Sequence, residues 1–219
     1  MVILAFTLPP GRGELEGGDP PPQFITIVSG LPRSGTSMMM KMLAAGGMHI
    51  LTDNIRVSDE DNPLGYFELE KVKALKDGEN EWLSEAQGKV VKIISALLHH
   101  IPPKYQYKII FMRRDLDEIL ASQKQMLVRR SEPTDKIDDD TLGGLFQKHL
   151  LQVEKWLSQQ PNIGVTYVYY NDMLQNPEPD IQKVVQFLDV NLDKSLMMGV
   201  PEKKLYRQRG RTTRYGNAT

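Results

Sequence analysis

A loop framed by two glycines follows the apolar run at residues 24–29, which is typical of a buried strand. Residues 30–37 read GLPRSGTS, directly after FITIVS. The two glycines and the hydroxyl of Ser37 keep the spacing of the nucleotide-phosphate loop G-x-x-x-x-G-K-[ST], but Thr36 stands in place of its lysine. In P-loop nucleotide hydrolases that lysine contacts the β- and γ-phosphates, so its loss removes the contact specific to a triphosphate.

The chemistry that remains in this loop suits a single phosphate-like group. Backbone N–H groups and the N-terminus of a following helix stabilise an anion, and Arg33 adds a cation. A bare pair of glycines at this spacing is more often only a turn between strand and helix. The run PRSGTS between a buried strand and a helix start favours an anion site.

A second candidate anchor follows another apolar segment. In FMRRDLDEILASQKQM, Arg114 comes directly after the predicted strand 107–113, and Ser122 lies eight positions further on. A guanidinium forms charge-assisted, often bidentate hydrogen bonds with phosphate. The alternative interpretation is an arginine in a surface ion pair and a serine that faces solvent.

These motifs resemble those of the sulfotransferases, which use 3′-phosphoadenosine 5′-phosphosulfate (PAPS). The run LPRSGTS is similar to the family's 5′-phosphosulfate loop, and an arginine followed eight residues later by a serine is similar to its 3′-phosphate motif. The resemblance implies that Arg33 lies beside the sulfuryl group and that Arg114 and Ser122 bind the 3′-phosphate. It also implies that the 5′-phosphate is cradled by Ser34, Gly35, Thr36 and Ser37.

A third segment, YVYYNDMLQNPEPDIQKVVQFLDV, resembles the family's pattern of Tyr-Glu-Asp-Met, Asn-Pro and a helix. Asn171 replaces the usual glutamate, and the matching Tyr170 would lie near the adenine. On sequence alone, an aromatic residue at a strand end is more often part of the core. PAPS has no β- and γ-phosphate pair, so the resemblance implies that no metal ion is required.

The general base is the least defined part of the predicted site. The family's cytosolic branch uses a histidine two residues after a lysine, and the corresponding run Lys92-Ile93-Ile94 lacks it. His99 and His100 lie several residues beyond the expected position and would face another surface. They are better interpreted as the polar edge of a short helix.

Acidic residues are the alternative base. The family branch that acts on protein tyrosines and some polysaccharides uses a glutamate shortly after the second strand. Asp53 falls close to that position, and Glu68 and Glu70 follow in the same polar loop. We therefore predict Asp53, and after it Glu68, as the catalytic base.

The expected elements alternate between strand and helix, which predicts an α/β fold with a parallel sheet. Strands are expected over residues 24–30, 48–51, 89–95, 107–113 and 165–170, and the main helices over 36–45, 116–128, 142–160 and 179–190. A capping box of Asp115 and Glu118 opens the second of these helices. The resemblance implies a three-layer parallel sheet flanked by helices, the P-loop NTPase-like sulfotransferase fold.

The chain divides into three expected parts. Residues 1–23 are rich in Pro, Gly and acid and predict a flexible leader. Residues 24–200 form the sulfotransferase-like domain. Residues 201–219 are a basic tail, whose arginines either close over the 3′-phosphate or remain solvated.

Composition excludes several classes of function. The 219 residues include 40% hydrophobic and 25% charged residues with a net charge of −1, which leaves no basic excess for a nucleic-acid backbone. The chain has no cysteine, which excludes disulfides, a thiol nucleophile and a cysteine metal site. No apolar run approaches the ~20 residues that cross a bilayer. We therefore expect no membrane partner and a cytoplasmic location.

The predicted function is transfer of a sulfuryl group from PAPS to a hydroxyl or amine, with a small molecule, glycan or peptide as acceptor. Two alternatives stay open. The first is a P-loop small-molecule kinase or other nucleotide-binding enzyme, against which Thr36 counts. The second is a non-catalytic sulfotransferase-like protein that only binds the nucleotide, which the missing histidine keeps in view.

Overall fold

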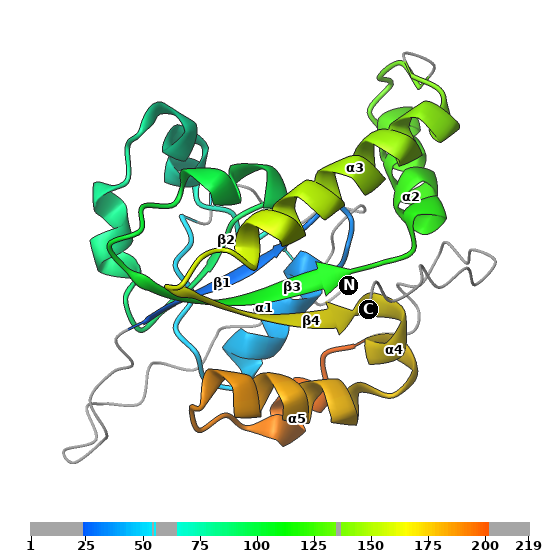
Figure 1. The fold of residues 1–219 in the computed structure, drawn as a ribbon. Coiled ribbons are helices and arrows are strands. Elements are labelled where there is room, and N and C mark those ends of the chain that lie inside the picture. Colours follow the sequence, from blue (N-terminus) through cyan, green and yellow to red (C-terminus); the bar gives the residue numbers. More distant parts are fainter. Residues whose placement is uncertain (1–23, 54, 56–64, 135–136, 202–219) are drawn as a thin grey trace.

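A four-stranded parallel sheet forms the centre of the computed structural model, which describes residues 24–53, 55, 65–134 and 137–201. The strand order is β2-β1-β3-β4, and every neighbouring pair is parallel. The strands are β1 (Phe24–Gly30), β2 (Val90–Lys92), β3 (Gln106–Arg113) and β4 (Ile163–Tyr169). Their carboxyl ends all point toward the same edge, on the right in Figure 1.

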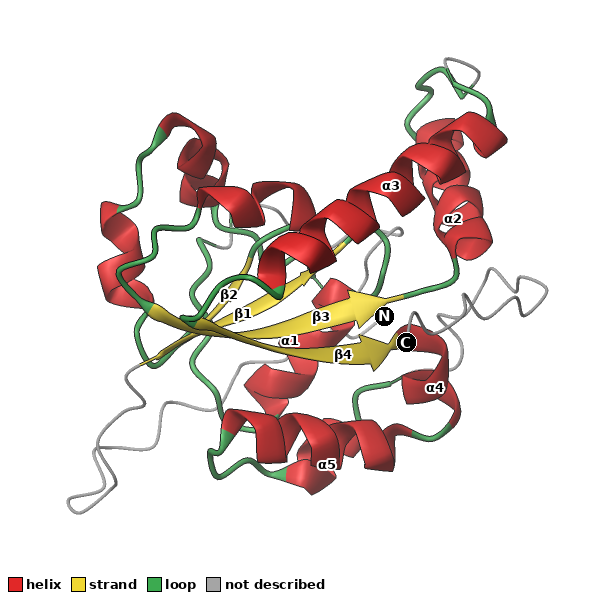
Figure 2. Cartoon of the chain, in the orientation of Figure 1, coloured by secondary structure: helices red, strands yellow, loops and turns green. Residues whose placement is uncertain are grey.

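Helices cover both faces of this sheet, as Figure 2 shows. One face carries α1 (Thr36–Ala45), α4 (Tyr170–Gln175), α5 (Pro177–Leu188) and α6 (Lys194–Met198). The other carries η1 (Glu70–Asp77), η2 (Glu81–Ala86), η3 (Ser95–His100) and α3 (Asp139–Leu157). Helix α2 (Leu116–Arg129) packs against α3 beyond the carboxyl edge. The predicted three-layer α/β architecture is confirmed.

Alternation along the strands places one large apolar cluster on each face of the sheet. In β3, Ile110 and Met112 face the α1 side, whereas Ile109 and Phe111 face the α3 side. Successive side chains of a strand point to opposite faces, so a central strand covered on both sides must be apolar throughout. Burial of each such side chain contributes roughly 1.5–3 kcal/mol relative to exposure.

Helix α1 carries the methionine-rich run that follows the glycine loop. Met38, Met39, Met40 and Met42 are all buried in the core cluster on the α1 face. These methionines therefore pack the core on this face. Gly47, with φ 104, lies in the glycine turn that follows the end of the helix.

The predicted strand 48–51 is wrong, because only Ile50 forms an isolated bridge with Val90. After Leu51 the chain turns away: the Thr52 hydroxyl and the Asp53 N–H both donate to the carbonyl of Glu68. Pairing with a loop distant in sequence therefore replaces further pairing with β2.

Other element boundaries also differ from the predictions, three of them next to candidate site residues or the segments that carry them. Strand β2 is shorter than the predicted 89–95, because the chain enters η3 directly after Ile94. Tyr170, predicted to end a strand, begins α4. Helix α3 starts earlier than predicted, at Asp139, since the Asp138 carboxylate caps it by accepting from the Thr141 N–H.

The predicted capping box of α2 forms only through its first member. Asp115 caps α2 by accepting from the N–H of Asp117. Glu118 directs its two carboxylate oxygens to Arg114 and Asn171.

The predicted leader lies outside the described residues, as does the predicted basic tail beyond residue 201. Within the described part of the chain, no helix is both long and apolar enough to span a bilayer. In that same part, no group of three or more His, Cys, Asp or Glu side chains is arranged to hold a metal ion.

Candidate functional site

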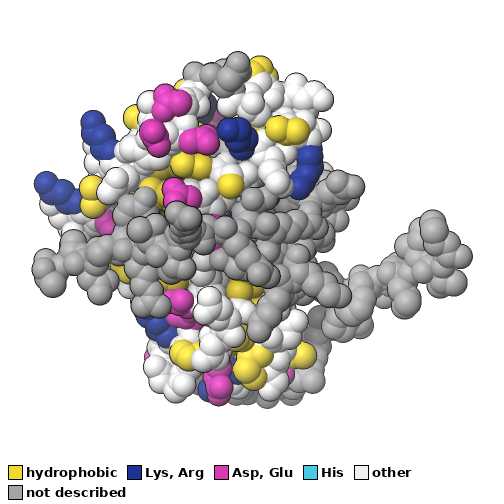
Figure 3. Space-filling model, turned by 90° about the vertical axis from the view of Figure 1, so that its right-hand side faces the viewer, with side chains coloured by type: hydrophobic (Ala, Val, Ile, Leu, Met, Phe, Trp, Pro, Cys, Tyr) yellow, Lys and Arg dark blue, Asp and Glu magenta, His cyan; other side chains and the backbone are white. Residues whose placement is uncertain are grey.

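The predicted anchors lie at the carboxyl edge of the sheet, on its two central strands. Strands β1 and β3 are neighbours, and Gly30 is in register with Met112. The loops that leave these strands carry Arg33 and Arg114, so strand pairing brings the two arginines together. Parallel sheets generally bind ligands at this edge. Figure 3 looks at this side of the molecule, where basic and acidic side chains of the described residues are both exposed.

The loop after β1 adopts backbone conformations that only some residues tolerate. Gly30 has φ 146 and Gly35 has φ 98, and Arg33, a non-glycine residue, has φ 70. A left-handed conformation costs an ordinary residue roughly 1–2 kcal/mol, and such strain concentrates at functional sites. A Cβ on Gly30 would lie 2.6 Å from the carbonyl oxygen of Met112, so the strand neighbour also requires glycine there.

The start of α1 leaves polar groups available to an anion. Its N-cap, Gly35, has no side chain to accept from the first-turn N–H groups. Ser34 is only 1% exposed, and its Oγ has no hydrogen-bond partner among the described residues. A buried hydroxyl and uncapped N–H groups at a helix N-terminus are the donors that a phosphate or sulfate group requires.

The two predicted anchors meet directly. The Arg33 Nε donates to Ser122 Oγ at 3.0 Å, and the Arg114 Nη1 donates to the carbonyl oxygen of Arg33 at 3.0 Å. The structure thus joins three predicted site residues that are 81 and 89 positions apart in sequence. Their contacts with a cofactor stay a prediction.

Tyr170 packs against this cluster. Its ring centroid is 4.5 Å from the Arg114 guanidinium carbon, and a Cβ on Gly35 would lie 2.4 Å from its Cδ2. Burial raises the pKa of the Tyr170 hydroxyl, and the positive charge of Arg114 partly opposes that rise. The Tyr170 ring therefore packs against both Arg114 and Gly35 of the loop. The predicted contact with adenine stays a prediction.

Lys92 is a functional candidate to which the sequence motifs assign no role of its own. Its Nζ donates to the Tyr66 carbonyl oxygen at 2.8 Å and lies 3.4 Å from Ser37 Oγ. The side chain is only 8% exposed, so a second cation is buried beside the glycine loop. A lysine at the carboxyl end of an apolar strand is the sequence signal that could have revealed it.

The two predicted acidic residues have different surroundings. Asp53 accepts from the Glu70 N–H at 2.6 Å and from the Ile55 N–H at 3.0 Å. These bonds, that from Glu70 foremost, hold the pKa of Asp53 below its ordinary value, which makes it a weaker base. Glu68 lies 3.6 Å from the Lys92 Nζ and is 38% exposed, so its carboxylate is both near the loop and accessible.

His99 and His149 lie on the α3 face of the sheet. His99, on η3, packs against Trp156 of α3 with ring centroids 4.7 Å apart. His149 of α3 shares a hydrogen bond with the Ser95 hydroxyl at 2.9 Å. Burial lowers the pKa of both imidazoles. These contacts join α3 to η3.

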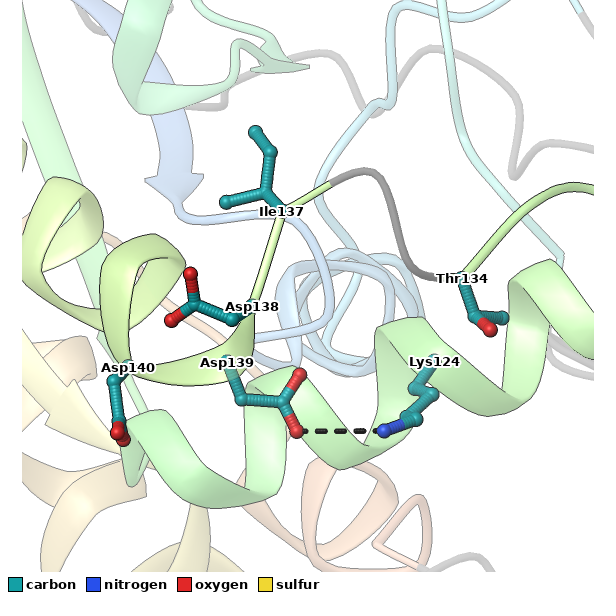
Figure 4. Close-up of a pocket in the computed structure, with 6 residues that line it drawn as sticks. All are labelled: Lys124, Thr134, Ile137, Asp138, Asp139 and Asp140. Atoms are coloured by element: carbon teal, nitrogen blue, oxygen red, sulfur yellow. Dashed lines mark ion pairs between the residues drawn. The ribbon is translucent and has the colours of Figure 1, made fainter.

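A pocket of about 390 Å³ lies between the end of α2 and the start of α3. Figure 4 shows Lys124 on α2 facing Asp139, 3.6 Å away across this pocket. Its lining consists of Lys124, Thr134, Ile137, Asp138, Asp139 and Asp140. None of the predicted site residues is among them, so the glycine loop and its neighbours remain the candidate site.

Comparison with known proteins bears on this arrangement of loop and arginines. Residues 25–204 match the model of the family described as the sulfotransferase domain. The chain belongs to the sulfotransferase family. The match covers all the site residues discussed above, from Arg33 to Tyr170. The resemblance inferred from the sequence is confirmed, and with it sulfotransfer as the general activity.

Individual relatives are distant. A Caenorhabditis briggsae protein whose name provisionally places it among the protein-tyrosine sulfotransferases is 24% identical over 198 residues, which are 79% of this chain and 68% of that protein. Among solved structures, a sulfotransferase domain from the curacin biosynthetic pathway is 13% identical, covering 79% of this chain and 76% of its own, with a TM-score of 0.46. A mouse sulfotransferase complexed with PAP is 14% identical, with a TM-score of 0.48, and the match covers 82% of this chain and 63% of the mouse chain.

Proposed function

We propose that this sulfotransferase moves the sulfuryl group of PAPS to a hydroxyl or amine acceptor. The observation that carries the proposal is the contact between the two anchors: Arg33 bonds to Ser122, and Arg114 bonds to the Arg33 backbone. A loop without the triphosphate lysine is thus joined to a second basic site at the same sheet edge. Two such sites suit a ligand with two separated anionic groups.

The residues of the cluster fit such a ligand by their donors. The buried Ser34 hydroxyl and the N–H groups at the start of α1 suit the 5′-phosphate. Arg114 and Ser122 suit the 3′-phosphate, since arginine binds phosphate in a fixed fork geometry. The remaining members of the proposed cofactor site are Gly35, Thr36, Ser37 and Tyr170.

Two cations of the glycine-loop region, Arg33 and Lys92, belong to the proposed catalytic site. When bound, PAPS supplies an activated sulfuryl group and a phosphate as its leaving group. Arg33, and the Lys92 Nζ beside Ser37, would stabilise the negative charge that develops on the departing oxygen. Such preorganised charges supply most of the catalysis in the related phosphoryl transfers, without covalent participation of the protein.

Glu68 is the better candidate for the base that takes the acceptor's proton. It is accessible and adjacent to Lys92, whereas both oxygens of Asp53 accept backbone N–H bonds. Asp53 as catalytic base stays a prediction, as do the identity of the acceptor and the cytoplasmic location.

One titration tests the cofactor. Isothermal calorimetry with adenosine 3′,5′-bisphosphate, and separately with ADP and magnesium, compares the two ligand classes on the same protein. We expect the bisphosphate to bind more tightly, because the loop lacks the lysine that holds a β/γ pair. Preference for ADP with magnesium would favour a nucleotide kinase. A transfer screen with radiolabelled sulfate over alcohols, phenols, amines and glycans then separates an enzyme from a non-catalytic binder.

Arg33→Ala tests the catalytic part. We expect kcat to fall by about 100-fold or more, the scale for loss of one preorganised charge-stabilising group. Steady-state kinetics with an acceptor found in the screen measures this. Arg130→Ala, which removes an exposed arginine after α2, is the matched control. Near-full turnover of Arg33→Ala would exclude Arg33 from the mechanism.

A further inference from the structure

A buried carboxylate, that of Glu118, lies behind the predicted 3′-phosphate arginine. Glu118 is only 2% exposed. Its Oε2 accepts from the Arg114 Nε at 2.9 Å, and its Oε1 accepts from the Asn171 Nδ2 at 3.0 Å. A carboxylate is costly to bury unless it is paired and hydrogen-bonded, and here both oxygens have donors. The buried charge of Glu118 is therefore compensated by specific hydrogen-bond donors.

The hydrogen bond between Glu118 and Arg114 is connected to the glycine loop through a second bond of Arg114. With its Nε held by Glu118, the Arg114 guanidinium turns its Nη1 to the carbonyl oxygen of Arg33. Arg33 is the loop residue with the left-handed backbone, φ 70. Strained conformations of this kind persist only where the surrounding structure holds them. The bond from Arg114 is one such restraint on the loop.

Tyr170 supplies a second route from Arg114 to the loop. The guanidinium lies over one side of the ring, and Gly35 packs closely against it. A shift of the guanidinium would therefore displace the ring on which the N-cap of α1 rests. Arg114 thus makes two contacts toward the loop, a hydrogen bond to the Arg33 carbonyl and packing on the Tyr170 ring. Both depend on the position in which Glu118 holds the guanidinium.

Asn171, next to Tyr170, places a neutral amide beside the Glu118 carboxylate. Asn171 stands where the family pattern has glutamate, and it donates to Glu118. A second carboxylate at position 171 would lie within hydrogen-bond distance of the first, and two such groups cannot both stay ionised at low cost. The neutral amide donates to Glu118 without adding a second negative charge beside it.

We propose that Glu118 is a positioning residue: its carboxylate, shared between Asn171 and Arg114, orients the Arg114 guanidinium and through it holds the glycine loop ready for its anionic ligand. This deepens the proposed function and rests on it for the identity of the ligand. Glu118 itself need not touch the ligand.

The first experiment reads the loop without any ligand. Hydrogen exchange followed by mass spectrometry on peptides covering residues 30–38 compares the wild type with Glu118→Gln. We expect the loop amides of the variant to exchange about tenfold faster or more, because local opening loses one of its restraints. Unchanged exchange in this loop would overturn the proposal.

The matched control is a partly buried ion pair at the end of β3. Arg113, the sequence neighbour of Arg114, pairs with Glu154 of α3 on the α3 face of the sheet. Glu154→Gln also removes one carboxylate from an arginine pair. We expect it to speed exchange in α3 and to leave the loop peptide unchanged. Equal loosening of the loop by both variants would show a general loss of stability and would count against a positioning role.

The second experiment measures binding of adenosine 3′,5′-bisphosphate by calorimetry. Glu118→Gln should weaken binding by about tenfold or more, the scale for loss of a charged hydrogen-bond partner. The double variant Glu118→Gln with Asn171→Asp should recover part of this loss. In it, the amide oxygen introduced at position 118 accepts from Arg114, while the NH₂ group of the same amide donates to the carboxylate introduced at position 171. Failure of the double variant to bind better than the single one would contradict the proposed hydrogen-bond pattern.

The two readouts separate this inference from the proposed function. If the wild type does not bind the bisphosphate but its loop responds to Glu118→Gln, the PAPS proposal fails and the positioning role stands. If the wild type binds and Glu118→Gln binds equally well with an unchanged loop, the positioning role is wrong. Should Glu118→Gln fail to fold, Glu118→Asp keeps the charge on a shorter arm, and its loop exchange should be faster than that of the wild type; an unchanged rate would overturn the proposal.

Discussion

Gly35 and Gly47 share a left-handed backbone but have different surroundings. Gly35 has φ 98 and Gly47 has φ 104. A Cβ on Gly35 would lie 2.4 Å from the Tyr170 ring, whereas one on Gly47 would meet nothing within 4 Å. At residue scale, Gly35 is therefore constrained both by its backbone and by a close contact, and Gly47 by its backbone alone.

Alanine at the two positions separates these constraints. Gly47→Ala should lower the free energy of unfolding by about 1 kcal/mol, the cost of the left-handed conformation. Gly35→Ala should cost roughly 1–3 kcal/mol more, because the Tyr170 ring must move. Urea unfolding of both variants at one pH measures the difference. Equal losses would mean that the ring shifts freely and does not hold the loop.

At the scale of elements, polar contacts fix α3 to its neighbours. The ion pair of Arg113 with Glu154 joins α3 to β3, and the hydrogen bond of His149 with Ser95 joins it to η3. Burial first, and the nearby His99 second, hold the pKa of His149 below its ordinary value. His149 is thus held in its neutral form, and its protonation opposes folding.

This gives a pH dependence with a definite sign. A depressed pKa means that the unfolded chain binds the proton more readily, so the stabilisation is present above the ordinary value of 6.5 and is lost as pH falls through the folded pKa. His149→Gln should therefore lose less of its unfolding free energy than the wild type between about pH 7.5 and about pH 5.5. Urea unfolding over a pH series measures this, with His49→Gln, which removes an exposed imidazole, as control. A variant with the same acid sensitivity as the wild type would contradict the assignment.

At the scale of the whole molecule, one sheet separates the two largest apolar clusters. Leu43 of α1 and Leu83 of η2 are both 0% exposed and belong to the clusters on opposite faces. Both tryptophans, Trp82 and Trp156, belong to the α3 side. Fluorescence therefore reports on one face and far-UV circular dichroism on the whole.

Paired core substitutions test whether the two faces unfold together. Leu43→Ala and Leu83→Ala should each lower the free energy of unfolding by about 2–5 kcal/mol. Because both faces pack on the same strands, each variant should shift the fluorescence and dichroism midpoints equally. A Leu43→Ala variant whose fluorescence midpoint stays at the wild-type value would show that the faces unfold separately.

The local parts of the site were predictable from the sequence alone. The glycine loop, strand β1 and helix α1 lie at the predicted residues, because glycine spacing, an unbroken apolar run and a helix stop are patterns of adjacent residues. The parallel sheet and the family followed from the same kind of pattern. The short strand predicted at 48–51 was wrong, because its pairing depended on a loop distant in sequence.

Which side chains meet depends on how the elements pack, and sequence patterns do not give it. The contact of Arg33 with Ser122 spans 89 positions, that of Lys92 with Ser37 spans 55, and that of Asn171 with Glu118 spans 53. Each depends on strand order and on how helices pack over the sheet. The physical reason is that the spacing of residues along a chain sets the face of an element on which a side chain lies, whereas its partners are set by packing of elements far apart in sequence.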